Sequence, residues 1–485
     1  MKTEQTKEAE GKRMNKKPVK SDLFQALFPI YYLCKAWGLL PVKFTEESPG
    51  RYVGELQIIF VIYNLLLVFF LLGAEVWGLY RDLKDGWASS TRFKNATAVI
   101  VTCSDVLSVI SLMGISILGS PFRWKYLQPV ADKLVQVDEK LGLVTPKRTR
   151  RFSIVLTAAT LIYLLFISSL DIYVWDRTSK INKKMIDKGP INYCPLYLMY
   201  VVIIIMEIQY AVSTYNIGQR FLRLNKSLEN ILRTGSITDY FRKDLGLAGD
   251  LREGHLTTYT ISDPGTLKAI KKLKVFSWDS AENDKKSMAD SISELITVHA
   301  NLCDTVTFSN HAFGLAMLAA TLTCLLHLII TPYILITEFL DKREGLFLLA
   351  QSTWIIFHTM RLIIIVQPTY NTVTKAKRTA ILVSQLLSSS PDAEAQKQLE
   401  IFSLQLLQRP LEFSACGLFS LDRPLVTSIA GAVTTYLVIL IQFQKADDTK
   451  CEIDKLDNIF KNASQILKNA SSLNNFTILK LNDRN

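Results

Sequence analysis

The chain alternates between long apolar runs and polar, basic stretches. Each apolar run is long enough to cross the roughly 30 Å hydrocarbon core of a bilayer, which takes about 20 helical residues. Hydrophobic residues make up 49% of the chain, which favours a membrane protein. We therefore predict an all-α membrane protein with seven transmembrane helices near Leu56–Leu79, Ala96–Leu118, Phe152–Trp175, Tyr193–Gly218, Ala312–Leu340, Leu346–Val366 and Leu425–Phe443.

The distribution of Lys and Arg predicts the orientation of these helices. Basic residues gather in the N-terminal segment and in the second, fourth and sixth loops, and such residues are retained on the cytoplasmic side. This predicts an inverted topology, with a cytoplasmic N-terminus and an extracellular C-terminus, unlike a G-protein-coupled receptor. The tail carries three glycosylation acceptor triplets, at Asn462, Asn469 and Asn475, which agrees with an external tail. The charged first residues predict no cleavable signal peptide.

The polar segments between the apolar runs predict further organisation. Residues 1–54 form a cytoplasmic N-terminus with a short re-entrant or interfacial helix within 22–43, and residues 55–230 hold transmembrane helices 1–4. Residues 231–289 are polar and glycine-containing, and we expect a flexible cytoplasmic insertion. A helical period returns at Asp290 and should run without a break into the fifth span, so residues 290–370 hold helices 5–6 with a cytoplasmic extension.

The C-terminal third has its own predicted divisions. Residues 371–422 should form a cytoplasmic anchor helix, for which Ser390 is the expected N-cap, followed by Pro391 in the first turn. Residues 423–444 form the last transmembrane helix, and residues 445–485 form the extracellular tail. Along this last helix, small or polar residues recur at a spacing of three and four: Ser428, Gly431, Thr435, Val438, Ile439 and Gln442. Such a face suits either a pore or a tight helix contact.

The end of the last apolar run carries a motif. Thr435-Tyr436, five hydrophobic residues and Gln442-Phe443 together resemble the closing motif of insect gustatory receptors. That resemblance implies a tetrameric, ligand-gated cation channel whose last helix lines the pore and whose subunits meet mainly at cytoplasmic helices. It makes Gln442 and Thr435 pore residues, and Val438 and Ile439 become gate candidates, with packing as the other interpretation. An amide without fixed charge implies weak selectivity among Na⁺, K⁺ and Ca²⁺.

A second resemblance concerns the branch of the family. The stretch from Thr369-Tyr370-Asn371 through Leu418-Phe419-Ser420-Leu421-Asp422 is similar to the fructose-receptor branch. We therefore expect a homotetrameric, sugar-gated, non-selective cation channel in the plasma membrane. A hetero-oligomer with other gustatory receptors, a receptor for bitter compounds and, more distantly, a secondary sugar transporter remain alternatives.

Polar and aromatic residues at membrane depth predict a ligand site, because such residues are costly in hydrocarbon. A carbohydrate needs paired donors and acceptors for its hydroxyls and aromatic rings for its C–H faces. Arg361 should instead snorkel or pair with an acid, with Asp105 as one candidate partner. Aromatic residues near helix ends also form interfacial belts, which is the competing explanation for some of these residues. The predicted ligand residues come from four spans: Asp105; Asp171 and Trp175; Thr331 and Tyr333; Gln351, Trp354 and His358.

Other classes of function find less support in the sequence. The formal net charge of +12 could indicate nucleic acid, but the excess lies in the predicted cytoplasmic loops. No CxxC pair, nucleophile elbow or metal-ligand spacing occurs, and His327 and His358 stand alone within their spans. We expect no enzyme activity, no cofactor and no metal.

Overall fold

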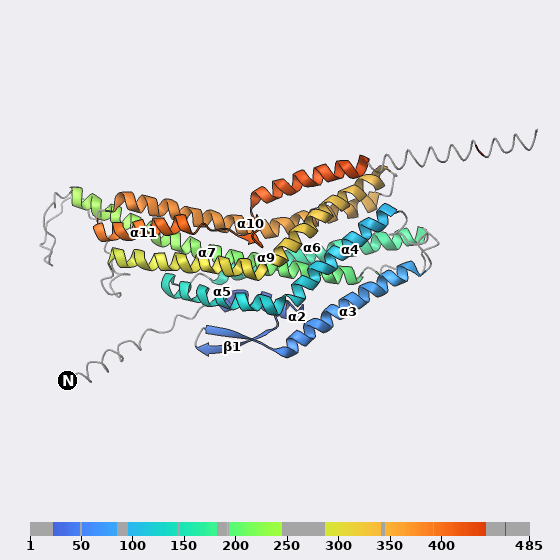
Figure 1. Ribbon diagram of the computed structural model, residues 1–485, viewed down its shortest axis with the longest axis horizontal. Coiled ribbons are helices and arrows are strands. Elements are labelled where there is room, and N and C mark those ends of the chain that lie inside the picture. The colour runs from blue at the N-terminus through green and yellow to red at the C-terminus, as the bar shows by residue number, and fades with distance from the viewer. Residues whose placement is uncertain are drawn as a thin grey trace, which may run out of the picture.

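The computed structural model describes residues 23–48, 51–84, 96–142, 146–181, 192, 194–244, 287–340, 345–390, 392–442 and 461. Within these residues the chain is nearly all helical, and long helices lie side by side in an elongated bundle (Figure 1). Phe443 and the predicted glycosylation sites Asn462, Asn469 and Asn475 lie outside the described residues.

The long helices follow the apolar runs closely. Six described helices are long and apolar enough to span a membrane, and a bent pair adds a seventh candidate, which confirms the predicted fold class. The elements are α2 (Leu23–Ala36), β1 (Val42–Ser48), β2 (Arg51–Leu56), α3 (Ile58–Leu83), α4 (Ala96–Leu118), α5 (Ser120–Leu141), α6 (Pro146–Ile181), α7 (Cys194–Asp244), α9 (Met288–Leu340), α10 (Gly345–Ser389), α11 (Ala393–Gln408), β3 (Ser414–Ala415), β4 (Phe419–Ser420) and a final helix, Arg423–Gln442.

The second span ends at a sharp bend. Helix α4 has the bounds predicted for this span, and α5 leaves it at an angle of 55° after Gly119. The sequence pattern did not predict α5 because the helix is polar on average, although Val130, Leu134 and Val137 on one side are buried. In Figure 1, α5 continues from this bend into the half of the bundle that contains α11.

A β-hairpin follows the short N-terminal helix, where the sequence predicted only helix and connecting chain. Strands β1 and β2 pair antiparallel from Val42 and Leu56 to Ser48 and Arg51. The hairpin docks on α5, where Trp124 Nε1 donates to the carbonyl of Gly54 at 2.9 Å. A Cβ atom at Gly54 would lie 2.2 Å from the Trp124 ring, so this close approach requires glycine.

Helix α7 runs through the middle of the bundle. In its most apolar window, 83% of the residues are buried, the largest share among the described candidate spans. The buried charged residues of this helix are paired inside the chain. Arg220 makes two hydrogen bonds with Asp138 of α5, Nε to Oδ1 at 3.0 Å and Nη2 to Oδ2 at 2.6 Å. A bidentate pair of this kind fixes the two helices relative to each other.

Three helices continue well beyond their apolar windows, and together with α5 and α11 they form the second half of the bundle (Figure 1). Helix α9 begins at Met288 and passes unbroken into the fifth span, which confirms the predicted extension. Helix α7 continues as helix to Asp244, into the segment predicted as a flexible insertion. Helix α10 runs on to Ser389 through Pro368.

The predicted cap of the helix that follows α10 was wrong by two residues. Asp392 is the N-cap of α11, and its carboxylate accepts a hydrogen bond from the backbone N–H of Glu394 at 3.2 Å. Asp392 has the extended backbone that a cap residue requires, directly before the first helical residue. Ser390 lies too far upstream to reach the free amides of the first turn.

Candidate functional site

The final helix is positioned by a tight turn that rests on α9. The side-chain amide of Asn310 binds the turn segment twice, donating to the carbonyl of Glu412 at 2.8 Å and accepting from the N–H of Ser414 at 3.3 Å. One helical turn later, a Cβ at Gly314 would lie 3.1 Å from the backbone nitrogen of Cys416. Asn310 and Gly314 therefore share a face of α9 that holds the β3–β4 turn closely.

The final helix touches the rest of the chain along one narrow side. Ile429 is buried against Leu362 and Val366 of α10. At the start of the helix, the guanidinium carbon of Arg423 lies 3.9 Å from the centre of the Tyr370 ring, a cation–π contact that fixes this end. In its apolar window only 6% of the residues are buried. The helix, orange-red in Figure 1, runs along the outer side of α9 and α10.

The predicted pore face of this helix points away from the chain's own core. Ser428, Gly431, Thr435 and Gln442 are exposed, and nothing lies within 4 Å of a Cβ placed at Gly431. The hydroxyl groups fold back on their own helix, as when Thr435 Oγ1 donates to the carbonyl of Gly431 at 3.0 Å. Two larger residues complete the face, with exposed fractions of 48% for Val438 and 38% for Ile439.

A cluster of buried aromatic and polar side chains occupies the membrane-spanning half of the bundle. The rings of His327 on α9 and His358 on α10 stack with their centres 4.2 Å apart, so the expectation that these residues stand alone was wrong. The Tyr200 hydroxyl of α7 lies 2.7 Å from His327 Nε2. Trp354 also stacks with His358, with ring centres 5.7 Å apart. Three helices thus contribute to one cluster.

Arg361 forms the innermost polar group of this cluster. It is fully buried and pairs with Glu207 of α7, Nη2 to Oε1 at 2.7 Å and Nε to Oε1 at 3.1 Å. Its Nη1 also lies 3.4 Å from His358 Nδ1. The prediction that Arg361 pairs with an acid is confirmed, while the alternatives of snorkelling and of pairing with Asp105 were wrong. A buried ion pair needs such complete pairing, because an uncompensated charge there is costly.

Two predicted acids lie at the rim of the cluster. The Asp105 carboxylate of α4 contacts His327 Nε2, and its side chain is 30% exposed while that of His327 is 4% exposed. Asp171 of α6 accepts a hydrogen bond from the hydroxyl of Tyr197, whose ring stacks on Trp354 with centres 6.2 Å apart. Both carboxylates therefore reach the same aromatic group from different helices.

The remaining predicted ligand residues lie on α6, α9 and α10, three of the helices that contribute to this cluster. Trp175 meets Phe347 edge to face at 6.4 Å between ring centres. Thr331 is buried one helical turn beyond His327, and Tyr333 is also buried on α9. Gln351 is half-buried one turn before Trp354. Thr331 and Gln351 are therefore neighbours of the cluster along their helices and not among its hydrogen-bonded members.

The sequence reasoning missed four members of the cluster as site residues: His327 on α9, and Tyr197, Tyr200 and Glu207 on α7. A signal for Glu207 was present, because it is an acid within an apolar run and Arg361 is the matching base within another. No comparable signal distinguishes Tyr200 from an ordinary core aromatic residue. Among the described residues, no group of three or more His, Cys, Asp or Glu side chains could hold a metal ion.

Comparison with known proteins identifies the family. The family described as 7tm Chemosensory receptor matches residues 27–447 of this chain. The chain belongs to this family, that of the insect gustatory receptors. It is a multi-span membrane receptor and not an enzyme.

Individual relatives are similar over most of the receptor's length. The Drosophila melanogaster protein named gustatory receptor for sugar taste 43a is 27% identical over 441 residues, covering 88% of this chain and all of the relative. Putative gustatory receptor 28a of the same fly is 25% identical over 450 residues, covering 88% of this chain and 94% of the relative. A shorter match, 30% identical over 108 residues, covers 22% of this chain and 20% of the gustatory receptor for bitter taste 66a.

The fold has a solved counterpart. The structure of the insect olfactory receptor OR5 from Machilis hrabei matches with a TM-score of 0.56 and 12% sequence identity, covering 87% of this chain and 98% of OR5. A second structure of OR5, in complex with eugenol, matches with the same TM-score. The receptor therefore has the fold of this insect chemoreceptor.

Proposed function

We propose that the receptor is one subunit of a homotetrameric, sugar-gated, non-selective cation channel in the plasma membrane, with fructose as the first sugar to test. One observation carries this proposal: the final helix is the least buried candidate span and exposes a face of small and polar residues. Lipid alone is a poor partner for that face, because the Gln442 amide has no hydrogen-bond partners in hydrocarbon. Copies of the same helix around a water-filled axis are a suitable partner for this face.

The pore is assigned to this face. Four Gln442 side chains would offer carbonyl oxygens to a passing cation without a fixed charge to hold it, which gives weak selectivity. Val438 and Ile439 lie one turn deeper and would close the path by excluding water when the helices approach. Thr435 continues the polar face beyond them.

The sugar site is assigned to the polar cluster. Asp105 and Asp171 at its rim would accept hydrogen bonds from sugar hydroxyls, and Trp354 and Trp175 would stack on C–H faces. His358 would discriminate between hydroxyl arrangements, since one ring nitrogen already faces Arg361. The partly exposed rim over a buried floor suits a small polyol better than a large apolar compound.

The contacts also suggest how the sugar site communicates with the pore. His358 and Arg361 of the cluster lie on α10, directly before Leu362, which packs with Val366 against Ile429 of the final helix. Leu328 of α9 follows His327 and packs against the same apolar group. A shift of α9 and α10 on sugar binding would therefore reach the final helix within one helical turn. Opening requires that the sugar bind the open arrangement more tightly.

Whole-cell recording tests the proposal. Cells expressing only this chain should give a cation current with fructose, and Gln442→Ala should change its relative permeabilities. Trp354→Phe should raise the fructose concentration needed for half-maximal current by about tenfold, which corresponds to 1.4 kcal/mol. Trp77→Phe is the matched control, because Trp77 lies on the exposed surface of α3. If no ligand evokes a current in cells that express the receptor on their surface together with other gustatory receptors, the proposal that it forms a channel would be contradicted.

A bitter-compound receptor is the second candidate, favoured by the shorter match to the bitter-taste relative. Current evoked by alkaloids and not by fructose, glucose or sucrose would establish that function and remove the sugar assignment. Saturable sugar uptake without current would instead indicate a transporter.

A further inference from the structure

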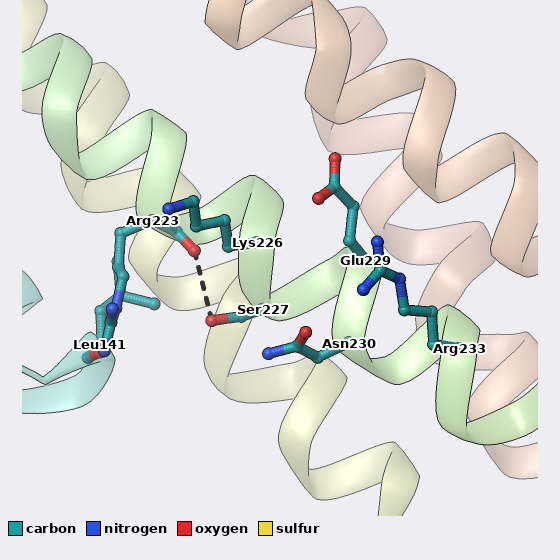
Figure 2. A pocket seen from close by; sticks show the side chains of 7 residues that line it. All are labelled: Leu141, Arg223, Lys226, Ser227, Glu229, Asn230 and Arg233. Atoms are coloured by element: carbon teal, nitrogen blue, oxygen red, sulfur yellow. Dashed lines mark hydrogen bonds between the residues drawn. The ribbon is translucent and has the colours of Figure 1, made fainter.

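A polar cavity of about 380 Å³ is lined by residues outside both the cluster and the final helix, as labelled in Figure 2. It opens on the part of α7 beyond the apolar run, where that helix passes the C-terminal end of α5. Neither the proposed sugar site nor the proposed pore uses it. The lining residues are Leu141, Arg223, Lys226, Ser227, Glu229, Asn230 and Arg233.

The cavity is built along one side of α7. Positions 223, 226, 227, 230 and 233 recur at three and four residues, so they lie on one side of the helix. Leu141 at the end of α5 supplies the facing wall, and its carbonyl accepts a hydrogen bond from Arg223 Nε at 3.3 Å. This bond holds the Arg223 guanidinium at the end of α5, and its two terminal nitrogens have no hydrogen-bond partner in the described part of the chain.

The charge of the cavity is strongly one-sided. Its single acid, Glu229, accepts a hydrogen bond from Arg378 of α10 at 2.6 Å, so that carboxylate is already neutralised from outside the cavity. Arg223, Lys226 and Arg233 have no ion pair in the described part of the chain. Three cations therefore face one space without an internal counter-charge. Asn230 adds a neutral donor beside them.

We propose that this cavity binds an anion that carries more than one phosphate group. Guanidinium groups bind phosphate oxygens in pairs, and three separate cations suit several phosphates better than one. The volume lies within the range of small-molecule sites and is far larger than a single phosphate needs. An inositol polyphosphate has this size and charge, whether free or as the headgroup of a phosphoinositide lipid.

The position along α7 permits both sources of the headgroup. At a rise of 1.5 Å per residue, Arg223 lies about 44 Å along the helix from Cys194. A bilayer with its headgroups is about 40–45 Å thick. If α7 begins at one surface of the membrane, the cavity begins at the opposite headgroup layer, which is predicted to be cytoplasmic. A lipid headgroup and a soluble inositol phosphate can both reach that level.

Binding to the purified full-length receptor in nanodiscs tests the proposal without any use of channel activity. The soluble probe is inositol trisphosphate, titrated by microscale thermophoresis at low and physiological salt. The lipid probe is phosphatidylinositol bisphosphate, presented in the nanodisc and read out as protection against thermal unfolding. The test variant combines Arg223→Ala, Lys226→Ala and Arg233→Ala. The matched control combines Lys43→Ala, Lys84→Ala and Lys397→Ala, which removes three exposed cations outside the cavity.

We expect the test variant to lose at least about tenfold in affinity, while the control variant binds like the unchanged receptor. Binding of the soluble probe to nanodiscs without the lipid would identify a free inositol phosphate as a sufficient ligand. Binding of the lipid probe alone would identify the membrane as the source. Equal losses in the test and control variants would overturn the proposal, because they would indicate only the overall positive charge. Failure of both probes to bind the unchanged receptor would overturn it as well.

Discussion

Helix α7 and the final helix show two opposite ways of placing polar groups in a membrane protein. In α7, 83% of the residues in the apolar window are buried, against 6% in the final helix. The buried charged side chains of α7 meet partners within the chain: Glu207 pairs with Arg361, and Arg220 pairs with Asp138. The polar side chains of the final helix face outward. We infer that polar residues of α7 serve the fold of one subunit, whereas those of the final helix serve what the subunits form together.

Helix α3 shows that exposure alone would not support this inference. It is also little buried, at 22% of its apolar window. Its exposed residues, however, are large and apolar, including Leu66, Phe69 and Phe70. Such a surface is satisfied by lipid. The difference between α3 and the final helix therefore lies in the chemistry that each exposes.

The largest effect is expected when the pairing inside the core is broken. Glu207→Ala leaves the Arg361 guanidinium buried and unpaired, which should cost about 3–5 kcal/mol and abolish surface expression. The measurement is thermal unfolding of the purified receptor together with surface biotinylation. The double variant Glu207→Leu with Arg361→Met should recover expression, because an apolar pair of similar volume removes the unpaired charge. Equal failure of the double variant would indicate a role beyond charge pairing.

A bulky residue on the final helix should reduce the current and leave folding intact, whereas Glu207→Ala should impair folding. Gly431→Trp has open space around it in one subunit, so folding and surface expression should be preserved. Around a fourfold axis the same ring would fill the pore, and we expect ligand-evoked current to fall by more than about tenfold. Gly73→Trp is the matched control, because Gly73 on α3 also has nothing within 4 Å. Normal current from Gly431→Trp would contradict the assignment of this face.

A Gly-to-Ala substitution should affect protein stability differently in α7 and in the final helix. A Cβ at Gly218 would lie 2.4 Å from Thr372 Oγ1, which itself donates to the carbonyl of Thr214 at 3.0 Å. Gly218→Ala should therefore cost about 1–3 kcal/mol through overpacking. Gly431→Ala meets no neighbour and should leave the melting temperature unchanged. Similar melting temperatures for the two variants would show that the interior of α7 is less tightly packed than the contacts indicate.

The smallest effect concerns a buried histidine in the extension of α9, outside the predicted span. Burial lowers the pKa of His299 to about 4, and Gln405 Nε2 lies 2.9 Å from its Nδ1. Because the pKa is lower in the folded state, stability from the neutral ring is present above about pH 6.5. It is lost as the pH falls toward 4. Lowering the pH from 7 to 5 should lower the melting temperature of the His299→Gln variant less than that of the unchanged receptor. An equal drop in both proteins would exclude His299 as the group responsible.

The sequence predicted the apolar spans well and their partners poorly. The bounds of α4 and the unbroken run of α9 follow from local periodicity, which a single sequence contains. The stacking of His327 on His358 and the pairing of Glu207 with Arg361 depend on the register of helices far apart in sequence. Local pattern carries no information on that register.

Two missed elements have physical reasons of their own. Helix α5 buries only a narrow apolar stripe. Because the helix is polar on average, the sequence shows no apolar run there. The β1–β2 hairpin is stabilised by its docking on Trp124 of α5, a tertiary contact that overrides the local preference of a short segment. Their spacing placed Thr435 and Gln442 on one face of the final helix and left a pore and a helix contact open, and the pore stays a prediction.

The central claim is that the outward face of the final helix meets water in the assembled receptor. The most direct measurement is the reaction of Thr435→Cys with a charged, water-soluble thiol reagent during recording, after exposed Cys103 and Cys416 are replaced by Ser. Phe69→Cys on α3 is the matched control, because it is exposed to the predicted lipid. We predict irreversible block of the ligand-evoked current through Thr435→Cys and no effect on Phe69→Cys. Normal currents from Thr435→Cys that the reagent leaves unchanged would contradict the claim.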